Sequence, residues 1–314
     1  MGVDLGGTKV AAGFVGPAGE RPAPPLRRAH SNAGPDDVIG ELVALLREVQ
    51  AREGLRIDRL GIGIAAQVDT RSGLVHHAPN LRWRNVPLGA RLKAEFGIPV
   101  TILNDARAAT IGEWRHGAGR GVENLLIVCW GTGVGGSAVI DGRVPEGANG
   151  AFGEIGHTIL FAGGRTCHCP GRGCLEAYVG GWAIAERARE AVVADPDAGR
   201  ALVARAGGRD QVAADAIGAL ARTGDPLARR LFDETLTWFG LGVAGLVNAY
   251  NPARVLLTGG VVDGWPEAIA ATQSAVRNHC QPPARDATVA AGELAGDAVL
   301  TGAASWARDP GEPR

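Results

Sequence analysis

The chain has 314 residues, of which 46% are hydrophobic and 21% charged, and its formal net charge at pH 7 is −1. This length suits about two domains with a core that folds without disulfides, and the composition excludes an intrinsically disordered chain. The near-neutral charge argues against a nucleic-acid-binding surface. Because no apolar run reaches about 18 residues and no leader precedes the first motif, we expect a cytoplasmic protein without a membrane partner.

Strand-like and helix-like stretches alternate over the first third of the chain. Hydrophobic spacing predicts strands at 10–15, 60–65 and 99–103, and helices at 38–52 and 88–96. The second helix is expected to end at Gly97. Such alternation is typical of an α/β sheet with helical crossovers.

A second section begins near Asn104. We predict a helix at 105–116, strands at 125–129 and 255–258, a hairpin from 137–140 with a turn at 141–142, and a last helix at 292–307. Residues 142–181 lack periodicity and are expected to form a loop. Helices fill most of 182–250, with breaks at Pro196 and Pro226, and the tail from Asp309 is expected to fray.

Three of the five cysteines, Cys167, Cys169 and Cys174, lie close together. In a chain without a leader, such clustering indicates metal ligands rather than disulfides. With the upstream His157 they form a Cys3His set, which is typical of structural zinc, and His168 is a rival fourth ligand. Free thiols in a loop are the alternative. Two further cysteines carry no metal prediction: Cys129, expected in the core, and Cys280.

The first glycine-rich turn follows Asp4 and contains Gly6, Gly7, Thr8 and Lys9. Paired glycines let the backbone approach a ligand closely, and exposed amide groups suit phosphate oxygens. Asp4 is a candidate magnesium ligand, usually through water. The alternative is a plain hairpin turn. The sequence is not a Walker A loop, because it lacks G-x-x-x-x-G-K-[ST].

A second turn, 131–136, satisfies G-x-G-x-x-G, but a dinucleotide-binding motif must open a helix and a strand is predicted here. We therefore predict a strand–loop–strand that binds phosphates through Gly131, Thr132, Gly133 and Gly135. A third pair, Gly259 and Gly260, follows the strand 255–258 and is a weaker candidate for a nucleotide contact.

Asp105 follows one predicted strand and opens the next helix. Either Asn104 or Asp105 could be the N-cap of that helix. Alternatively, Asp105 is a base at the carboxyl end of a strand, where open α/β sheets bind their ligands.

Two longer sequence motifs lie between the second and third glycine turns. Residues 147–157 read G-A-N-G-A-F-G-E-I-G-H and residues 167–176 read C-H-C-P-G-R-G-C-L-E. Together with the 4–9 turn and Asn104-Asp105-Ala106, they resemble the ROK family (repressors, open reading frames and sugar kinases), bacterial glucokinases above all. The resemblance spans about residues 2–305. It implies the two-lobed α/β fold of actin, heat-shock and sugar-kinase ATPases with the active site between the lobes, and commonly a homodimer or homotetramer.

The resemblance also implies a division of the chain and a role for each motif. One lobe is expected at 1–104, rejoined by the last helix at about 292–308, and the other at 105–291 with a zinc segment at 157–176. The implied reaction is ATP-dependent phosphorylation of the hexose 6-hydroxyl, with Mg-ATP bound by Asp4 and the glycine turns and with Asp105 as the base. Sugar contacts are implied for five further residues: Asn80, Asn104, Glu154, His157 and Glu176. A single zinc ion would anchor Glu154 and Glu176 near one point, although as surface glutamates they would need no explanation.

Several alternatives stay open at this stage. N-acetylmannosamine, N-acetylglucosamine or fructose could replace glucose, and polyphosphate could replace ATP. A ROK repressor would need a helix-turn-helix before Asp4, and a non-catalytic sugar-binding protein would not need Asp105. The chain departs from the family at Arg107, where asparagine is usual, and at Pro170, where glycine is usual.

Overall fold

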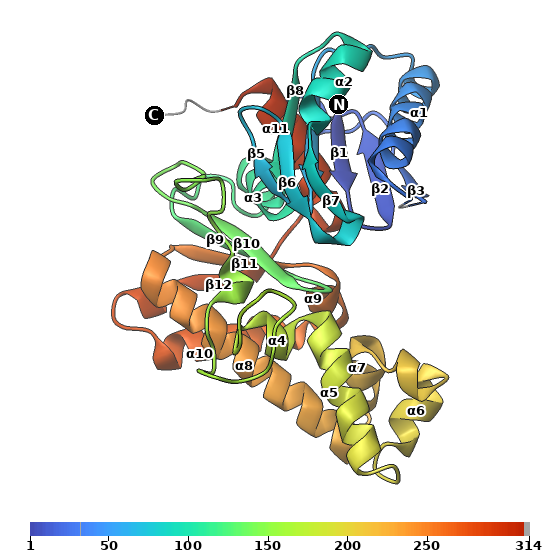
Figure 1. Cartoon of the computed structure of the whole chain (residues 1–314). Helices are drawn as coiled ribbons and strands as arrows, with labels where there is room; N and C mark the ends of the chain where they lie inside the picture. The colour runs from blue at the N-terminus through green and yellow to red at the C-terminus, as the bar shows by residue number, and fades with distance from the viewer. Residues whose placement is uncertain (32, 311–314) are drawn as a thin grey trace. The chain divides into compact units, whose positions relative to one another are not determined.

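The computed structural model describes residues 1–31 and 33–310, and the chain forms two compact units (Figure 1). Unit 1 comprises Met1–Glu123, Ser137–Gly153 and the segment from Gly292 onward, and unit 2 comprises Asn124–Gly136 and Glu154–Ala291. Unit 1 thus extends past residue 104, the expected lobe boundary, and the division into two functional lobes stays a prediction. The expected fraying of the tail falls mainly on residues 311–314, which lie outside the described residues.

The main sheet of unit 1 has five strands in the order β3-β2-β1-β4-β8. Strands β1, β4 and β8 are parallel, and β2 and β3 continue the sheet antiparallel. The strand bounds are Gly2–Leu5 (β1), Lys9–Gly13 (β2), Leu26–Ala29 (β3), Leu60–Ile64 (β4) and Val100–Asn104 (β8). Since the three parallel strands run in one direction, their carboxyl ends meet at one edge of the sheet.

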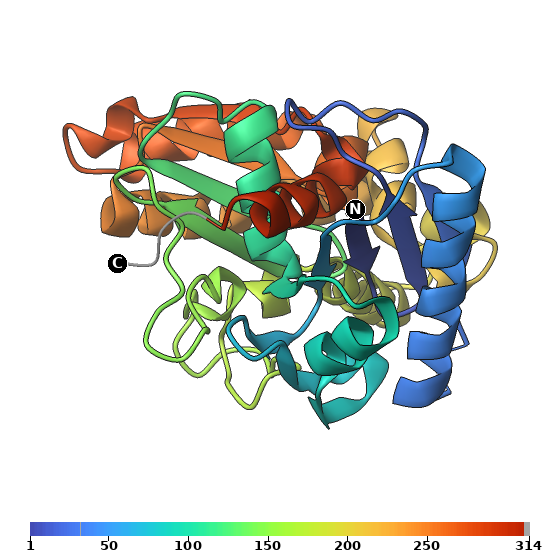
Figure 2. The same ribbon diagram turned by 90° about the horizontal axis from the view of Figure 1, so that it is seen from above.

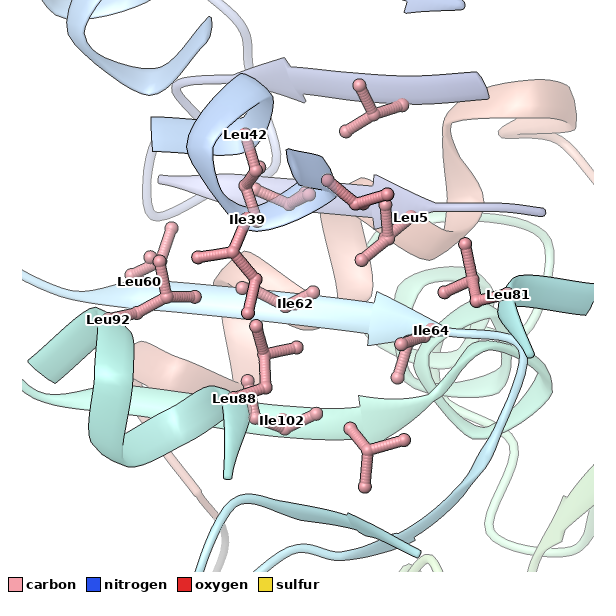
Figure 3. Close-up of a cluster of buried hydrophobic side chains, with 14 of the residues drawn as sticks. Leu5, Ile39, Leu42, Leu60, Ile62, Ile64, Leu81, Leu88, Leu92 and Ile102 are labelled. Carbon is pink, nitrogen blue, oxygen red and sulfur yellow. The ribbon is translucent and has the colours of Figure 1, made fainter. Parts of the chain in front are cut away.

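The sequence of β4, L-G-I-G-I, explains how this sheet is covered on its two faces. Successive side chains of a strand point to opposite faces, so Leu60, Ile62 and Ile64 lie in the core with α1 (Pro35–Glu53) and α2 (Leu88–Phe96), as Figure 3 shows. The glycines face α3 (Asp105–His116) and α11 (Ala298–Arg308), which pack against each other and cross in Figure 2. A Cβ at Gly61 would lie 1.9 Å from the carbonyl oxygen of Ala303, so only glycine permits this close packing.

Unit 1 also contains a small antiparallel sheet that the sequence analysis did not predict. It consists of β5 (Gln67–Asp69), β6 (Leu74–Ala78) and β7 (Trp83–Val86), with one 3-10 turn at Pro79–Leu81. This turn carries Asn80.

A four-stranded sheet has the order β10-β9-β11-β12 and belongs to unit 2, except for the end of β10 from Ser137 onward. Its strands are Leu125–Trp130 (β9), Val134–Val139 (β10), Arg254–Thr258 (β11) and Thr288–Ala291 (β12). The helices are Glu176–Val179 (α4), Gly181–Ala194 (α5), Arg200–Ala206 (α6), Ala214–Arg222 (α7), Pro226–Tyr250 (α8), Gly260–Gly264 (α9) and Glu267–His279 (α10). Trp130 stacks on Phe239 of α8 with ring centroids 3.8 Å apart and contacts Trp265 edge-on, which fixes β9 in the core. No described helix combines the length and apolar character that a membrane span requires.

Most predicted elements are confirmed within a few residues, including the helices at 88–96 and 105–116, and Pro226 does begin a helix. The last helix is the main error, because it begins at Ala298 instead of residue 292. The buried carboxylate of Glu113 accepts the backbone N–H groups of Glu293 at 3.0 Å and Leu294 at 2.7 Å. These bonds hold the segment before Ala298 in a turn and keep it out of the helix. The strands β3 and β12 and the helix α10 were not predicted.

Candidate active site

Two carboxylates lie at the carboxyl edge of the unit 1 sheet. Asp4 of β1 pairs with Gly63 of β4, and the next residue of β4 pairs with Asn104, directly before Asp105. A Cβ at Gly63 would lie 2.4 Å from the Cγ1 of Val299 and 3.0 Å from the Cβ of Ala108, so the glycine makes room for α11 and α3. Burial and the negative charge of Asp105 together raise the pKa of Asp4 to about 6. An anionic site of this kind favours a bound cation.

Asn104 is the N-cap of α3. Its Oδ1 accepts the backbone N–H of Arg107 at 3.1 Å, and its Nδ2 donates to the carbonyl of Ala66 at 3.3 Å. Asp105 is the first residue of the helix, and its carboxylate accepts the N–H of Ala106 at 2.8 Å. Asn104 is therefore the N-cap, and helix capping does not explain why residue 105 is an aspartate.

The first glycine turn joins β1 to β2 and is closed by a hydrogen bond from the Gly6 N–H to the Lys9 carbonyl at 2.9 Å. Gly7 packs against Asn80, since a Cβ on Gly7 would lie 2.7 Å from the Asn80 Cβ. His30, which was not predicted, binds the same turn: its ring Nε2 lies 2.9 Å from the Gly6 carbonyl oxygen, and its backbone N–H donates to the Thr8 carbonyl at 3.1 Å. Nothing in the sequence around His30 marks it for this position.

The second glycine turn joins β9 to β10, so the strand–loop–strand prediction is confirmed and the dinucleotide-binding alternative fails. The turn is shorter than predicted, because Gly135 already belongs to β10. The start of α5 is bonded to it: Gly181 donates to the Gly131 carbonyl at 2.9 Å and Trp182 to the Thr132 carbonyl at 3.1 Å.

The third glycine pair lies beside the second turn. Gly259 has a φ of 105°, and a Cβ there would lie 2.5 Å from the carbonyl oxygen of Trp130, directly before Gly131. Gly260 begins α9. The positive φ and the close approach both require glycine at 259.

The structure gathers His157, Cys167, Cys169 and Cys174, whose ligand atoms all lie within 4.8 Å of one another. The Sγ atoms of Cys169 and Cys174 are 3.6 Å apart, and the Cys167 Sγ lies 3.7 Å from the His157 Nδ1. Zinc–sulfur bonds of about 2.3 Å in a tetrahedron separate two sulfurs by about 3.8 Å, so these residues fit zinc. His168 lies outside this set, with its ring stacked on Trp182 at a centroid distance of 3.8 Å.

Both predicted sugar-binding carboxylates of unit 2 lie next to this cluster. Glu154 Oε2 is 3.9 Å from Nε2 of His157. Glu176 accepts two hydrogen bonds, one from the Val134 N–H at 2.9 Å and one from the indole Nε1 of Trp182 at 3.3 Å. Glu176 therefore joins the cysteine segment to the second glycine turn.

Arg107 has a structural explanation. Its guanidinium is 1% exposed and donates to the carbonyl of Gly150 at 2.9 Å and to Thr70 at 3.3 Å, with Glu146 at 3.5 Å as the nearest charge. The arginine thus fixes the segment 146–150 against the first turn of α3. That segment ends shortly before Glu154 in the sequence.

Comparison with known proteins covers almost the whole chain. The model of the ROK family matches residues 1–310. The glucokinase of Streptomyces coelicolor is 33% identical over 99% of this chain and 98% of its own length. A crystal structure of a ROK family glucokinase from Streptomyces griseus, in complex with glucose and AMPPNP, has a TM-score of 0.85 and 33% identity over 98% of both chains. The ROK hexokinase from Thermus thermophilus has a TM-score of 0.80 and 31% identity, covering 98% of this chain and 97% of that one. The chain therefore has the α/β fold of these kinases, and it belongs to the ROK family.

Proposed function

We propose that this protein transfers the terminal phosphoryl group of ATP to the 6-hydroxyl of a hexose, and that glucose is its substrate. The observation that carries this proposal is the pair of carboxylates, Asp4 and Asp105, at the carboxyl ends of the parallel strands of the unit 1 sheet. The similarity to glucokinases over nearly the whole chain supports the substrate.

Asp105 is the proposed base. It is the first residue of α3 and directly follows the end of a parallel strand, and its carboxylate is the proposed acceptor of the proton of the attacking hydroxyl. Proton abstraction by a positioned carboxylate contributes roughly 10²–10⁴-fold to the rate.

Asp4 is the proposed magnesium ligand, acting through water. Its raised pKa fits this role, because a cation would stabilise the buried charged form. When bound, Mg²⁺ neutralises charge that develops on the transferring phosphoryl group. The glycine turns are the proposed phosphate-binding segments: Gly6, Gly7, Thr8, Lys9, Gly131, Thr132 and Gly133, with Gly135, Gly259 and Gly260 adjoining them. The N–H groups of Gly6 and Gly131 close these turns by donating to the carbonyls of Lys9 and Gly133, so the remaining backbone N–H groups are the proposed donors to phosphate.

The hexose hydroxyls are the proposed partners of Asn80, Asn104, Glu154, His157 and Glu176. Ionised carboxylates accept hydrogen bonds from paired hydroxyls, which a sugar ring presents. Asn104 already uses its amide as a cap and as a donor to Ala66, so it is held in one orientation. Fixed polar groups of this kind favour one ring geometry over another.

Zinc is the proposed structural ion of the segment 157–176, bound by His157, Cys167, Cys169 and Cys174. Burial raises the pKa of the Cys167 thiol to about 12, so the thiolate that zinc requires is unfavourable there without a metal. The four-residue set leaves no open position for a substrate, which is typical of a structural site.

A panel of sugars tests the function. Purified protein is mixed with ATP or polyphosphate and with glucose, fructose, N-acetylglucosamine or N-acetylmannosamine, and donor consumption is followed at varied sugar concentrations. We expect the highest kcat/KM for glucose with ATP. A higher kcat/KM for an acetamido sugar would show that this sugar, and not glucose, is the substrate. No donor consumption with any sugar would refute the proposed kinase function.

A further inference from the structure

Trp182 lies where three parts of unit 2 meet. Its backbone N–H donates to the carbonyl of Thr132 in the second glycine turn at 3.1 Å. Its indole Nε1 donates to Glu176 Oε1 at 3.3 Å, and its ring stacks on His168 of the cysteine segment with an interplanar angle of 15°. One residue at the start of α5 thus contacts the second glycine turn through its backbone, and Glu176 and the cysteine segment through its side chain.

The carboxylate of Glu176 is held from two directions. Oε2 accepts the Val134 N–H and Oε1 accepts the indole N–H of Trp182. A Cβ at Gly133 would lie 2.5 Å from Oε2, so the carboxylate reaches this position only because residue 133 is glycine. Each carboxylate oxygen can accept about two hydrogen bonds, so one bond to each leaves capacity for two sugar hydroxyls.

We propose that Trp182 is a positioning residue that fixes Glu176 for sugar binding, and that its stack with His168 connects this carboxylate to the metal segment. The proposal rests on the sugar-kinase function proposed above. A glutamate side chain that is free to rotate must be ordered when the sugar binds, which lowers affinity. The hydrogen bond from the indole N–H of Trp182 to the Glu176 carboxylate fixes this side chain before the sugar binds.

Trp182→Phe is the decisive variant, because it keeps the aromatic ring and the backbone N–H and removes only the indole donor. We expect the KM and the calorimetric Kd for glucose to rise roughly 2- to 12-fold, the range that ordering one side chain on binding costs. The kcat, the KM for ATP, the zinc content and the melting temperature are expected to stay close to wild type. Trp238→Phe is the matched control in the same unit, since Trp238 packs on Phe161 and Tyr178, and it is expected to leave the glucose KM unchanged.

A double-mutant cycle tests whether Trp182 acts through Glu176. The kcat/KM for glucose is measured from initial linear rates for Trp182→Phe, Glu176→Ala and the double variant. We expect Trp182→Phe to have little further effect once Glu176 is absent. A second variant, His168→Ala, is expected to raise the glucose KM by a smaller factor and to retain zinc.

Three results would overturn the proposal: an unchanged glucose KM in Trp182→Phe, fully additive effects in the cycle, or loss of zinc or thermal stability in Trp182→Phe, which would make its role structural. These outcomes require an active wild type. A wild type that is inactive with every sugar refutes the kinase function instead, so the two failures are distinguishable.

Discussion

Asp4 is the residue at which the proposed chemistry and the stability of the fold oppose one another most clearly. Burial and the neighbouring Asp105 raise its pKa from 3.8 to about 6. Each pKa unit corresponds to about 1.4 kcal/mol, so the ionised carboxylate lowers the stability of the native state at pH 7.5 by about 3 kcal/mol. Asp4→Asn keeps the shape and removes the charge. We therefore expect the variant to be more stable than wild type while its nucleotide use is impaired.

The pH dependence follows from the sign of this shift. Because the native carboxyl binds its proton more tightly than the unfolded one, wild type loses stability as the pH rises from 3.8 to about 6. The gain in stability of Asp4→Asn over wild type is therefore largest above pH 6 and almost absent at pH 4. For domains of this size, about 3 kcal/mol corresponds to an increase in Tm of roughly 6–12 °C.

Calorimetric melts of both proteins at pH 7.5, 5 and 4 measure this difference. Asp58→Asn is the control, because Asp58 is exposed and its contact with Arg56 is 4.0 Å long, so the change is expected to be small at every pH. A Tm for Asp4→Asn at or below that of wild type at pH 7.5 would refute the reasoning, as would an advantage that persists undiminished at pH 4.

Two further variants test the metal segment and the departure at position 107. Cys169→Ser is expected to lose zinc and to weaken glucose binding at least about tenfold while ATP binding changes little, as measured by metal analysis and calorimetric titration; equal loss of both affinities would contradict this. Arg107→Ala removes a buried guanidinium that binds Gly150 and Thr70, so we expect the free energy of unfolding to fall by about 2–4 kcal/mol. Arg107→Lys is expected to recover only part of this stability, because lysine lacks the planar guanidinium that donates in two directions. Chemical denaturation that shows no loss for Arg107→Ala would refute the anchoring role of this residue.

The sequence predicted correctly those elements whose ends are marked by residues adjacent in the chain, such as a glycine that ends a helix. The helix at 88–96 ends at Gly97, which has a φ of 66° and accommodates the left-handed end of a helix. The second glycine turn was likewise predicted correctly as a connection between strands. In both cases the residues that decide the conformation are adjacent in the chain.

The elements that the sequence did not predict depend on residues distant in the chain. The start of α11 is set by Glu113, which binds the backbone of Glu293 and Leu294. No periodicity marks His30 as a partner of the first glycine turn or Trp182 as a partner of Glu176. The strands β5 to β7 are only three to five residues long, so alternation of apolar and polar residues along them is too short to predict a strand.

The most direct test of the proposed mechanism is the rate and product of the reaction with Asp105→Asn. Wild type and variant are incubated with ATP and glucose, the turnover is measured at saturating substrates, and the position of the phosphate on the sugar is determined by ³¹P and ¹³C NMR. We predict that wild type forms glucose 6-phosphate and that the variant has a kcat lower by about 10²–10⁴-fold, with a much smaller change in its calorimetric Kd for glucose. A variant that retains more than about one tenth of the wild-type kcat, or a wild type that phosphorylates another position, would contradict the assignment of Asp105 as the base for the 6-hydroxyl.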